Sequence, residues 1–376
     1  MRAVTITSKD HSPRVREVAE PSLPGSGHLL IKVLEVGVCG TDRAIVRGEG
    51  GEPPAGSDLL TLGHEMLGQV VQIDADVSGF EPGELVVCTV RRSCGQCEFC
   101  GHGASDMCSS GMYTERGIRR ANGYDTELIT ESIDYCVRVP AELRPFAVLT
   151  EPLTVVEKAI LESVTLQHRL DWVKATVGSP SPLSADWRFT KRALIAGAGP
   201  IGMMGAFLLR LRGIETHVID IVDDDSYKAQ LIASIGATYH DSRKGSAAEL
   251  AGQIGNIDLI VEATGVAPVA WDLLDALGVN GVLVFTGVPG DRGGEFQMEG
   301  GHLMRQQVLR NQIVLGSVNA NRSYFEMAVS DMQTMALRWP TQLAKVITGK
   351  HPLEQCGEIL AAQAEGEVKA VFTIAS

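Results

Sequence analysis

The sequence predicts an α/β fold made of a partly open β-barrel and a doubly wound parallel sheet. Its first third contains short apolar runs separated by Gly, Pro and Asp, which is typical of strands joined by turns. From about Thr190 apolar strands alternate with helical segments, which is typical of a parallel sheet with helices on both faces. The length of 376 residues also exceeds the size at which one hydrophobic core keeps growing. We therefore expect two domains.

The individual elements follow from these patterns. Barrel strands are predicted at HLLIKVLEVGV (28–38), GQVVQIDADV (68–77) and GELVVCTV (83–90). The elements predicted in the second half are the strand RALIAGAG (192–199), the helix PIGMMGAFLLRLRG (200–213), the strand THVIDI (216–221), a helix ending near Gly236, and the strands IDLIVEATG (257–265) and GVLVFTGV (281–288).

A linking segment of roughly 152–188 separates the two regions. Its first part, LTVVEKAILESV (153–164), has a helical pattern, and SPSPLSADW (179–187) has that of a loop. From about Asn319 the chain returns to mixed helix and strand, so we expect it to fold back on the N-terminal domain. The predicted domains are 1–187 with 317–376 for the barrel, and 188–316 for the parallel sheet.

Composition and charge limit the kind of partner. With 33 basic against 46 acidic residues the formal charge is −13, which disfavours binding to nucleic acid or to an anionic membrane. The sequence has no run of eighteen apolar residues, and its first residues lack the apolar core of a secretion signal. We expect a cytoplasmic protein that acts on a small molecule.

Four of the eight cysteines, Cys94, Cys97, Cys100 and Cys108, fall within fifteen residues. Their spacing, C-x2-C-x2-C-x7-C, lets one loop present four thiolates to a tetrahedral zinc that has no open position. The predicted site is therefore structural, and a cytosolic setting keeps the thiols reduced. An iron–sulfur site or a loop of plain reduced cysteines is the alternative.

A second metal pattern combines Cys39-Gly-Thr41-Asp42 with Gly63-His64-Glu65. A thiolate and a neutral imidazole can anchor zinc while a carboxylate completes or tunes the set and one position stays open for substrate. The Thr41 hydroxyl, two residues beyond the thiolate, is suited to begin a proton relay. Alone, Cys39 or His64 would be read as an inert core residue, but paired ahead of a four-cysteine loop they predict a catalytic metal.

The segment Gly197-Ala-Gly199-Pro200-Ile201-Gly202 follows a predicted strand and begins a predicted helix. In this context the glycines permit a tight turn and a close approach of a pyrophosphate to the helix N-terminus. Asp220, about twenty residues further on, is placed to accept hydrogen bonds from the adenosine ribose. Its charge would repel a 2′-phosphate, which favours NAD over NADP. The acidic run 223–225 is the alternative ribose contact, or a solvated loop.

Thr150-Glu151-Pro152-Leu153 stands where the two predicted domains meet. Glu151 could reach the catalytic metal from this position. From spacing alone, an acid that complements a helix N-terminus is the better interpretation.

Together these motifs resemble the zinc-containing medium-chain dehydrogenases, the relatives of alcohol dehydrogenase. The C-G-T-D, G-H-E, four-cysteine and G-A-G-P-I-G motifs occur in that family's order along the whole chain. The resemblance implies a GroES-like catalytic domain, a Rossmann domain, and hydride transfer from an alcohol carbon to C4 of nicotinamide. It also implies a dimer or tetramer, with a tetramer favoured, that extends the Rossmann sheet. The strand 281–288 is a candidate edge for this, unless it is simply buried.

Three longer segments resemble those of the glucose 1-dehydrogenase branch of this family. They are TEPLTVVEKAI (150–160), VRRSCGQC (90–97) and GSVNANRSYFEMA, which starts at Gly316. This resemblance implies Cys39, His64, Glu65 and Glu151 around a catalytic zinc, and Thr41, Glu115, Glu151 and Asn319 as sugar contacts. Several members of the branch carry Arg after the second Rossmann strand and accept NADP, whereas this chain reads IDIVDDD. That departure supports NAD as the cofactor, with NADP possible. It also weakens the assumption that this chain has the same sugar specificity as the rest of the branch.

The predicted reaction is oxidation of an aldose at C1 to an aldonolactone, with zinc acidifying the hydroxyl and Thr41 passing on its proton. A sorbitol-like polyol or L-threonine dehydrogenase on the same scaffold is the nearest alternative. A non-catalytic, crystallin-like cofactor-binding protein is a remote one, because such relatives generally lack the zinc ligands.

Overall fold

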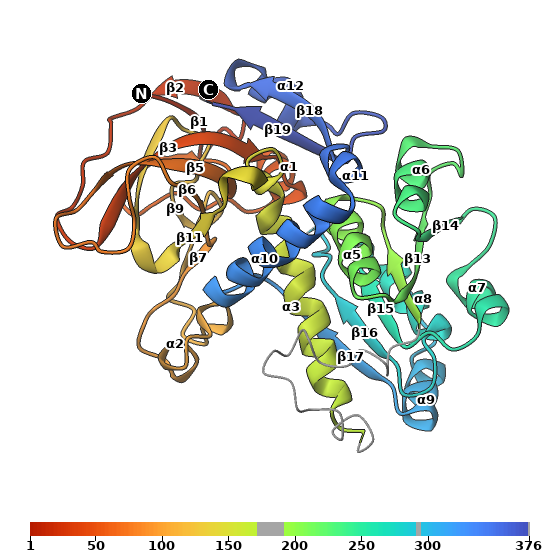
Figure 1. The fold of residues 1–376 in the computed structure, drawn as a ribbon. Helices are drawn as coiled ribbons and strands as arrows, with labels where there is room; N and C mark the ends of the chain where they lie inside the picture. The colour runs from red at the N-terminus through yellow and green to blue at the C-terminus, as the bar shows by residue number, and fades with distance from the viewer. Residues whose placement is uncertain (171–191, 291–294, 375–376) are drawn as a thin grey trace. The chain divides into compact units, whose positions relative to one another are not determined.

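The computed structural model describes residues 1–170, 192–290 and 295–374. Within them the chain forms two compact units, Met1–Thr154 with Asn319–Ser376, and Val155–Val318 (Figure 1). The predicted loop 179–187 and the predicted domain boundary at 187/188 lie outside the described residues. The domain limits drawn from the sequence therefore stay a prediction.

The first unit is built mainly from antiparallel strands. These strands are β1 (Arg2–Thr7), β2 (Arg14–Glu17), β3 (His28–Gly37), β4 (Leu59–Thr61), β5 (Glu65–Ile73), β6 (Leu85–Cys88), β7 (Arg91–Arg92), β8 (Thr114–Arg116), β9 (Arg120–Ala121), β10 (Leu128–Ser132), β11 (Cys136–Val139), β18 (Ile347–Pro352) and β19 (Lys369–Thr373). Its helices are α1 (Gly40–Val46), α2 (Glu98–Gly101), α10 (Arg322–Arg338), α11 (Pro340–Ala344) and α12 (Cys356–Ala361).

Strand β3 is the centre of this unit. It pairs antiparallel with β5, β10 and β19 in a seven-stranded sheet of order β11-β6-β5-β3-β19-β18, with β10 attached to β3. Leu29, Ile31 and Val33 are buried and alternate with partly exposed residues, so one face of the strand packs into the core. The predicted strands at 28–38, 68–77 and 83–90 are confirmed as β3, β5 and β6.

The C-terminal segment returns to the first unit as predicted. Val371 of β19 lies opposite Gly37 of β3, so these strands lie side by side although most of the chain separates them (Figure 1). The hydrophobic core collects side chains from both ends of the chain, including Val4, Ile31, Leu360 and Phe372. Folding of this unit therefore depends on contacts of very large sequence separation.

The second unit is a six-stranded parallel sheet of order β14-β13-β12-β15-β16-β17. Its strands are β12 (Arg192–Ala196), β13 (Glu215–Asp220), β14 (Thr238–Asp241), β15 (Leu259–Glu262), β16 (Val282–Phe285) and β17 (Ile313–Gly316). Its helices are the continuation of α3 (Thr150–Gln167), then α5 (Pro200–Leu211), α6 (Tyr227–Ser234), α7 (Ala247–Ile254), α8 (Ala267–Ala276) and α9 (Gly300–Arg310).

Helices cover both faces of this sheet, because successive residues of β12 face opposite ways. Ile195 packs toward Gly205 of α5, whereas its neighbour Leu194 shares a hydrophobic cluster with Leu250 of α7 and Leu273 of α8. The predicted doubly wound sheet and the predicted helix at 153–164 are confirmed. The strand order reverses between β12 and β15, beside the loop that follows β12, which is where ligands bind in such sheets.

One candidate from the sequence is wrong. The apolar strand 281–288 is not an edge, because β16 is paired with β15 on one side and with β17 on the other. A strand buried on both sides needs the same apolar composition as an edge that a second chain covers, so composition alone did not separate the two. The edges of the sheet are β14 and β17.

Candidate active site and metal centres

Cys39, His64 and Glu65 lie together in the first unit. One ligand atom from each falls within 4.8 Å of the others. Cys39 immediately precedes α1, while His64 and Glu65 stand at the start of β5. Sulfur, imidazole nitrogen and carboxylate oxygen in a largely buried setting are the donor set that zinc takes in enzymes. The predicted proximity of Cys39 and His64 is therefore present, and the residues fit a metal ion.

Asp42 links the two halves of this group. Its Oδ2 accepts a hydrogen bond of 2.8 Å from the backbone N–H of Cys39, and its Oδ1 lies 3.2 Å from Nδ1 of His64. Burial alone would lower the pKa of His64, but the Asp42 carboxylate and the Cys39 sulfur outweigh it and raise this pKa well above its usual value. The surroundings thus favour a positive charge at the position of the imidazole. A carboxylate this close to one ring nitrogen leaves the other ring nitrogen as the one suited to face a metal.

Glu65 is paired with Lys369 of β19. The Lys369 Nζ lies 2.7 and 2.6 Å from the two carboxylate oxygens and donates a further hydrogen bond of 3.0 Å to the carbonyl of Val38. Both side chains of the pair are at most 1% exposed. Burial alone lowers the pKa of Lys369, but the Glu65 carboxylate and the Cys39 sulfur outweigh it and raise the pKa. The site therefore contains a charged ammonium group that competes with a metal for Glu65.

Gly37 makes room for this carboxylate. It lies opposite Glu65 in the β3–β5 pairing, and a Cβ at Gly37 would stand 2.1 Å from Oε2 of Glu65. Any side chain at position 37 would therefore have to displace the Glu65 carboxylate from its place beside Lys369.

Glu151 and Thr41 lie at the first turns of helices. Glu151, at the start of α3, is half-buried, and it is not one of the residues whose ligand atoms cluster within 4.8 Å. Burial, and secondly the negative charge of Glu65, raise the pKa of Glu151 to about 7. Thr41, in the first turn of α1, is exposed. The roles predicted for these two residues stay predictions.

The four cysteines of the loop 94–108 converge as their spacing predicts. The Sγ of Cys97 lies 3.3 Å from that of Cys100 and 4.0 Å from that of Cys108, and the sulfurs of Cys94 and Cys100 are 3.9 Å apart. Four thiolates at about 2.3 Å from one zinc stand roughly 3.8 Å apart. Backbone N–H groups of Cys100 and Ser109 lower the pKa of Cys97 to about 5. The loop is thus arranged for thiolate ligands to a metal.

The glycine-rich segment joins β12 to α5 in the second unit. Gly197 has a φ of +104°, Gly199 caps α5, and Pro200 occupies the first turn with Ile201. A Cβ at Gly202 would lie 1.9 Å from the carbonyl oxygen of Gly197, whereas one at Gly199 would meet nothing within 4 Å. The helix N-terminus therefore opens onto free space, as a bound pyrophosphate needs.

Asp220, at the end of β13, holds this loop. Its Oδ2 accepts a hydrogen bond of 2.5 Å from the N–H of Ala198, and its Oδ1 accepts one of 2.6 Å from the N–H of Ile221. It also lines a pocket of about 580 Å³, together with Ser242, Thr264, Asp272 and Asp275. Three carboxylates among the residues that line this pocket disfavour the binding of an adenosine 2′-phosphate there.

The sugar contacts implied by the resemblance, Glu115 and Asn319, touch each other. The Asn319 Nδ2 donates a hydrogen bond of 2.5 Å to Oε1 of Glu115 across 204 residues of sequence. Asn319 has a φ of +61°, a left-handed conformation that asparagine tolerates better than most residues.

Comparison with known proteins bears on the identity of this site. The model for the glucose dehydrogenase C-terminus matches residues 144–374, and that for the alcohol dehydrogenase GroES-like domain matches 25–141. The chain is 38% identical to the glucose 1-dehydrogenase of Methanocella arvoryzae over 377 residues, which covers 100% of this chain and 99% of that protein. The chain belongs to the glucose dehydrogenase family of zinc-dependent medium-chain dehydrogenases.

Two further members of the family are similar to this chain over nearly its whole length. The Thermoproteus tenax glucose 1-dehydrogenase is 39% identical over 360 residues, covering 95% of each chain. A Haloferax mediterranei glucose dehydrogenase, solved in complex with NADP, Zn and gluconolactone, has a TM-score of 0.84 and 32% identity over 100% of both chains. The predicted GroES-like and Rossmann architecture is thereby confirmed.

Two polar residues beside the metal group of this family member were missed in the sequence. Lys369 stands alone in the apolar run VKAVFT, and a lysine in such a run signals a buried partner. Asp125 is buried, and its Oδ1 has no hydrogen-bond partner within the described residues. Burial, and secondly the negative charge of Asp42, raise the pKa of Asp125 well above its usual value.

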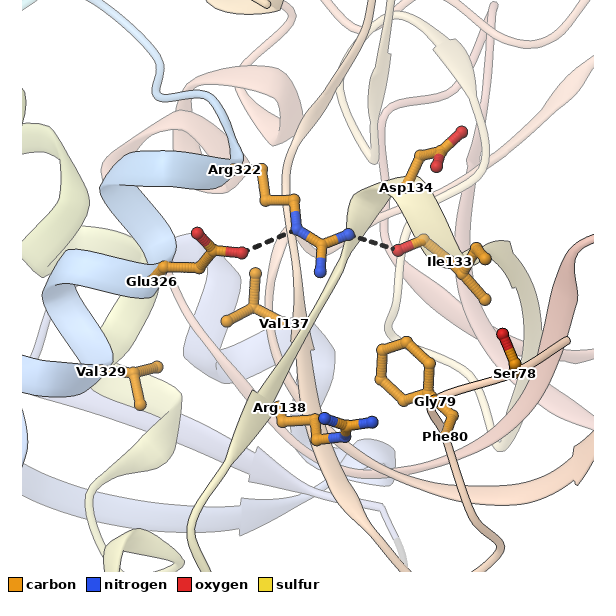
Figure 2. Close-up of a pocket in the computed structure, with 10 residues that line it drawn as sticks. All are labelled: Ser78, Gly79, Phe80, Ile133, Asp134, Val137, Arg138, Arg322, Glu326 and Val329. Carbon is orange, nitrogen blue, oxygen red and sulfur yellow. Dashed lines mark hydrogen bonds and ion pairs between the residues drawn. The ribbon is translucent and has the colours of Figure 1, made fainter.

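A separate surface pocket of about 430 Å³ contains none of the predicted site residues. Figure 2 shows Arg322 of α10 at its centre, donating to the Glu326 carboxylate and to the Ile133 carbonyl, each at 2.8 Å. The guanidinium of Arg138 lies 4.7 Å from the centre of the Phe80 ring at its other side. The guanidinium groups of Arg322 and Arg138 contact protein groups, and Arg322 joins α10 to the segment just before β11.

Proposed function

We propose that the protein oxidises an aldose, glucose or a related sugar, at C1 and transfers the hydride to a nicotinamide cofactor, with an aldonolactone as product. One observation carries the proposal: the ligand atoms of Cys39, His64 and Glu65 lie within 4.8 Å of one another in a member of the glucose dehydrogenase family. The retained metal donors also argue against a crystallin-like, non-catalytic protein.

Cys39 and His64 are the proposed protein ligands of the catalytic zinc, with Glu65 and Glu151 as the carboxylates that complete or tune the set. Bound there, zinc would supply the Lewis acidity that brings an alcohol proton into the neutral pH range. Asp42 orients His64, and Lys369 balances the charge of Glu65. The exposed Thr41 hydroxyl takes the proton from the sugar C1 hydroxyl and passes it to water, while C1 gives up its hydride.

The remaining proposed contacts orient the substrates. Glu115 and Asn319 bind hydroxyl groups of the sugar, and Thr41 and Glu151 contact the same sugar. Gly197, Gly199, Pro200, Ile201 and Gly202 cradle the cofactor pyrophosphate, and Asp220 meets the adenosine ribose. Because Asp220, Asp272 and Asp275 all line one pocket, we propose NAD as the preferred cofactor and NADP as the weaker one. Cys94, Cys97, Cys100 and Cys108 hold a second, structural zinc.

A substrate panel tests this function. Zinc-replete protein is assayed for NADH and NADPH formation with aldoses, sorbitol-like polyols and L-threonine. Activity with aldoses first, higher kcat/KM with NAD than with NADP, and loss of activity in Cys39→Ala are expected. Preferential oxidation of polyols or threonine would replace the aldose assignment, and unchanged sugar oxidation by Cys39→Ala would overturn the metal scheme.

The protein is proposed to work as a homo-oligomer in the cytoplasm, with a tetramer favoured. The edge strand β17 and the neighbouring helix α9, on which Met304, Val308 and Leu309 are about two-thirds exposed, offer an apolar surface for a second copy. Sedimentation velocity of the wild type and of Val308→Glu tests this surface. None of the helices in the described ranges has the length and apolar character needed to span a bilayer.

A further inference from the structure

A closed circuit of hydrogen bonds surrounds the proposed sugar contacts in the first unit. Asn319 donates to Glu115, Arg91 donates to both Glu115 and the backbone carbonyl of Asp106, and the Asn321 Nδ2 donates to Oδ1 of Asp106 at 2.9 Å. Residues 319–321 close the circuit through the backbone. Four segments are thereby tied together: the strand β7, the 3-10 turn Ser105–Met107, the strand β8, and the residues at the start of α10, which lie about 200 residues further along the chain.

Arg91 is the member that joins the most partners. It lies directly opposite Glu115 in the β7–β8 pairing, and its Nε and Nη2 lie 3.2 and 3.1 Å from Oε1 of that carboxylate. Its guanidinium also stands 4.0 Å from the centre of the Tyr113 ring. The Arg91 side chain is only 9% exposed, so these contacts hold it in one orientation.

The donors to Glu115 all converge on one oxygen. Oε1 accepts from Arg91 and from Asn319, whereas no hydrogen bond within the described residues reaches Oε2. A carboxylate fixed through one oxygen and open at the other is prepared to accept a hydrogen bond from a hydroxyl group. Because the carboxylate is already immobilised, a sugar that binds it loses less free energy in ordering this side chain.

We infer that Arg91 is a positioning residue for the sugar: it fixes Glu115 so that the second carboxylate oxygen receives a hydroxyl of the substrate. This inference rests on the proposed function. Arg91 itself touches neither the sugar nor the cofactor in this scheme, and it acts through Glu115. It therefore affects the binding of a polyhydroxylated substrate and leaves the binding of the nicotinamide cofactor unchanged.

The test is a steady-state comparison of Arg91→Met and Arg91→Lys with the wild type. Arg91→Met keeps much of the apolar stem and removes all donors, and we expect KM for glucose to rise about 10-fold while KM for the cofactor is unchanged. A lysine at position 91 can donate to Glu115 or to the Asp106 carbonyl, but it lacks the planar guanidinium that reaches both at once. For Arg91→Lys we therefore expect an intermediate rise in KM for glucose, about 3-fold.

Arg119→Met is the matched control. Arg119 approaches the same Tyr113 ring, at 5.1 Å, but its ion pair is with Glu52 and not with Glu115. We expect its KM for glucose to stay within about 2-fold of the wild type. Thermal unfolding and zinc content of every variant show whether the fold is retained, and a purely structural role of Arg91 would lower stability without a selective rise in sugar KM.

A double-variant cycle with Glu115→Gln separates action through Glu115 from an independent effect. If Arg91 acts through Glu115, Arg91→Met adds little to the KM of Glu115→Gln. A sugar KM unchanged in Arg91→Met, or one multiplied by the full 10-fold in the double variant, overturns the inference. Absence of sugar oxidation in the wild type is a different result, because it refutes the proposed function and the inference with it.

Discussion

Replacement of Lys369 by methionine is the sharpest test of the buried charges at the site. Methionine keeps the apolar stem but leaves the Glu65 carboxylate, 1% exposed, without its cation and the Val38 carbonyl without its donor. Breaking a buried ion pair from one side costs about 3–5 kcal/mol, because an uncompensated charge stays behind. We expect Lys369→Met to lower the free energy of unfolding by that amount.

The neighbouring strand offers a matched control. Lys350 of β18 pairs with Glu35 of β3, but its side chain is 45% exposed. Lys350→Met makes the same chemical change in a half-buried pair, because Glu35 is 10% exposed but its lysine is largely in water. We therefore expect it to cost clearly less than Lys369→Met, about 1–2 kcal/mol. Urea unfolding followed by tryptophan fluorescence, at one fixed zinc concentration, measures both variants.

The double variant Glu65→Gln/Lys369→Met separates charge from packing. It removes both charges, so we expect it to be more stable than Lys369→Met alone. Equal losses in Lys369→Met and Lys350→Met, or a double variant less stable than Lys369→Met, would refute the argument that the pair is held together by burial of opposite charges.

Three further predictions concern other parts of the molecule. Cys97→Ser should lower the zinc content from two ions per chain to one, whereas serine at the buried Cys356, outside both metal groups, should keep two, as elemental analysis can show. Burial alone raises the pKa of Glu131, but its two arginine partners outweigh it and lower the pKa below 4.5. The stability that this carboxylate contributes is therefore present above pH 4.5 and is lost as the pH falls through its folded-state pKa. Glu131→Gln should accordingly destabilise the protein most at neutral pH and progressively less in acid, and a pH-independent difference in urea unfolding would contradict this. Gly202→Ala should raise KM for the cofactor at least about 10-fold, because its Cβ would stand 1.9 Å from the Gly197 carbonyl oxygen, and an unchanged value would show that the loop adapts.

The parts of the site that sequence could predict are those written locally in the chain. The spacing of four cysteines within one loop predicts a metal site. So do a thiol and an imidazole that each have a carboxylate close by in the sequence. The partner of Glu65 could not be found in this way, because Lys369 is 304 residues away. Glu115 and Asn319 are predicted as sugar contacts only through resemblance, since neither residue has a local signal, and their hydrogen bond to each other is seen only in the structure.

The error in the sheet has a similar cause. The apolar composition of 281–288 fits either an edge strand or a simple buried strand, and the buried alternative is the one observed, whereas the edge β17 is only four residues long. Periodicity identifies a strand from its own residues, whereas its place in a sheet depends on which other strands pair with it.

The position of Lys369 in the chain also determines when, during translation, its ion pair with Glu65 can form. Glu65 leaves the ribosome early, and the cation that neutralises it is translated only after the complete second unit. Until then the acidic centre has to remain hydrated or protonated, and a nascent chain that stops before β19 cannot bury it stably. Assembly of the buried ion pair at the dehydrogenase centre therefore has to wait until β19 has been translated.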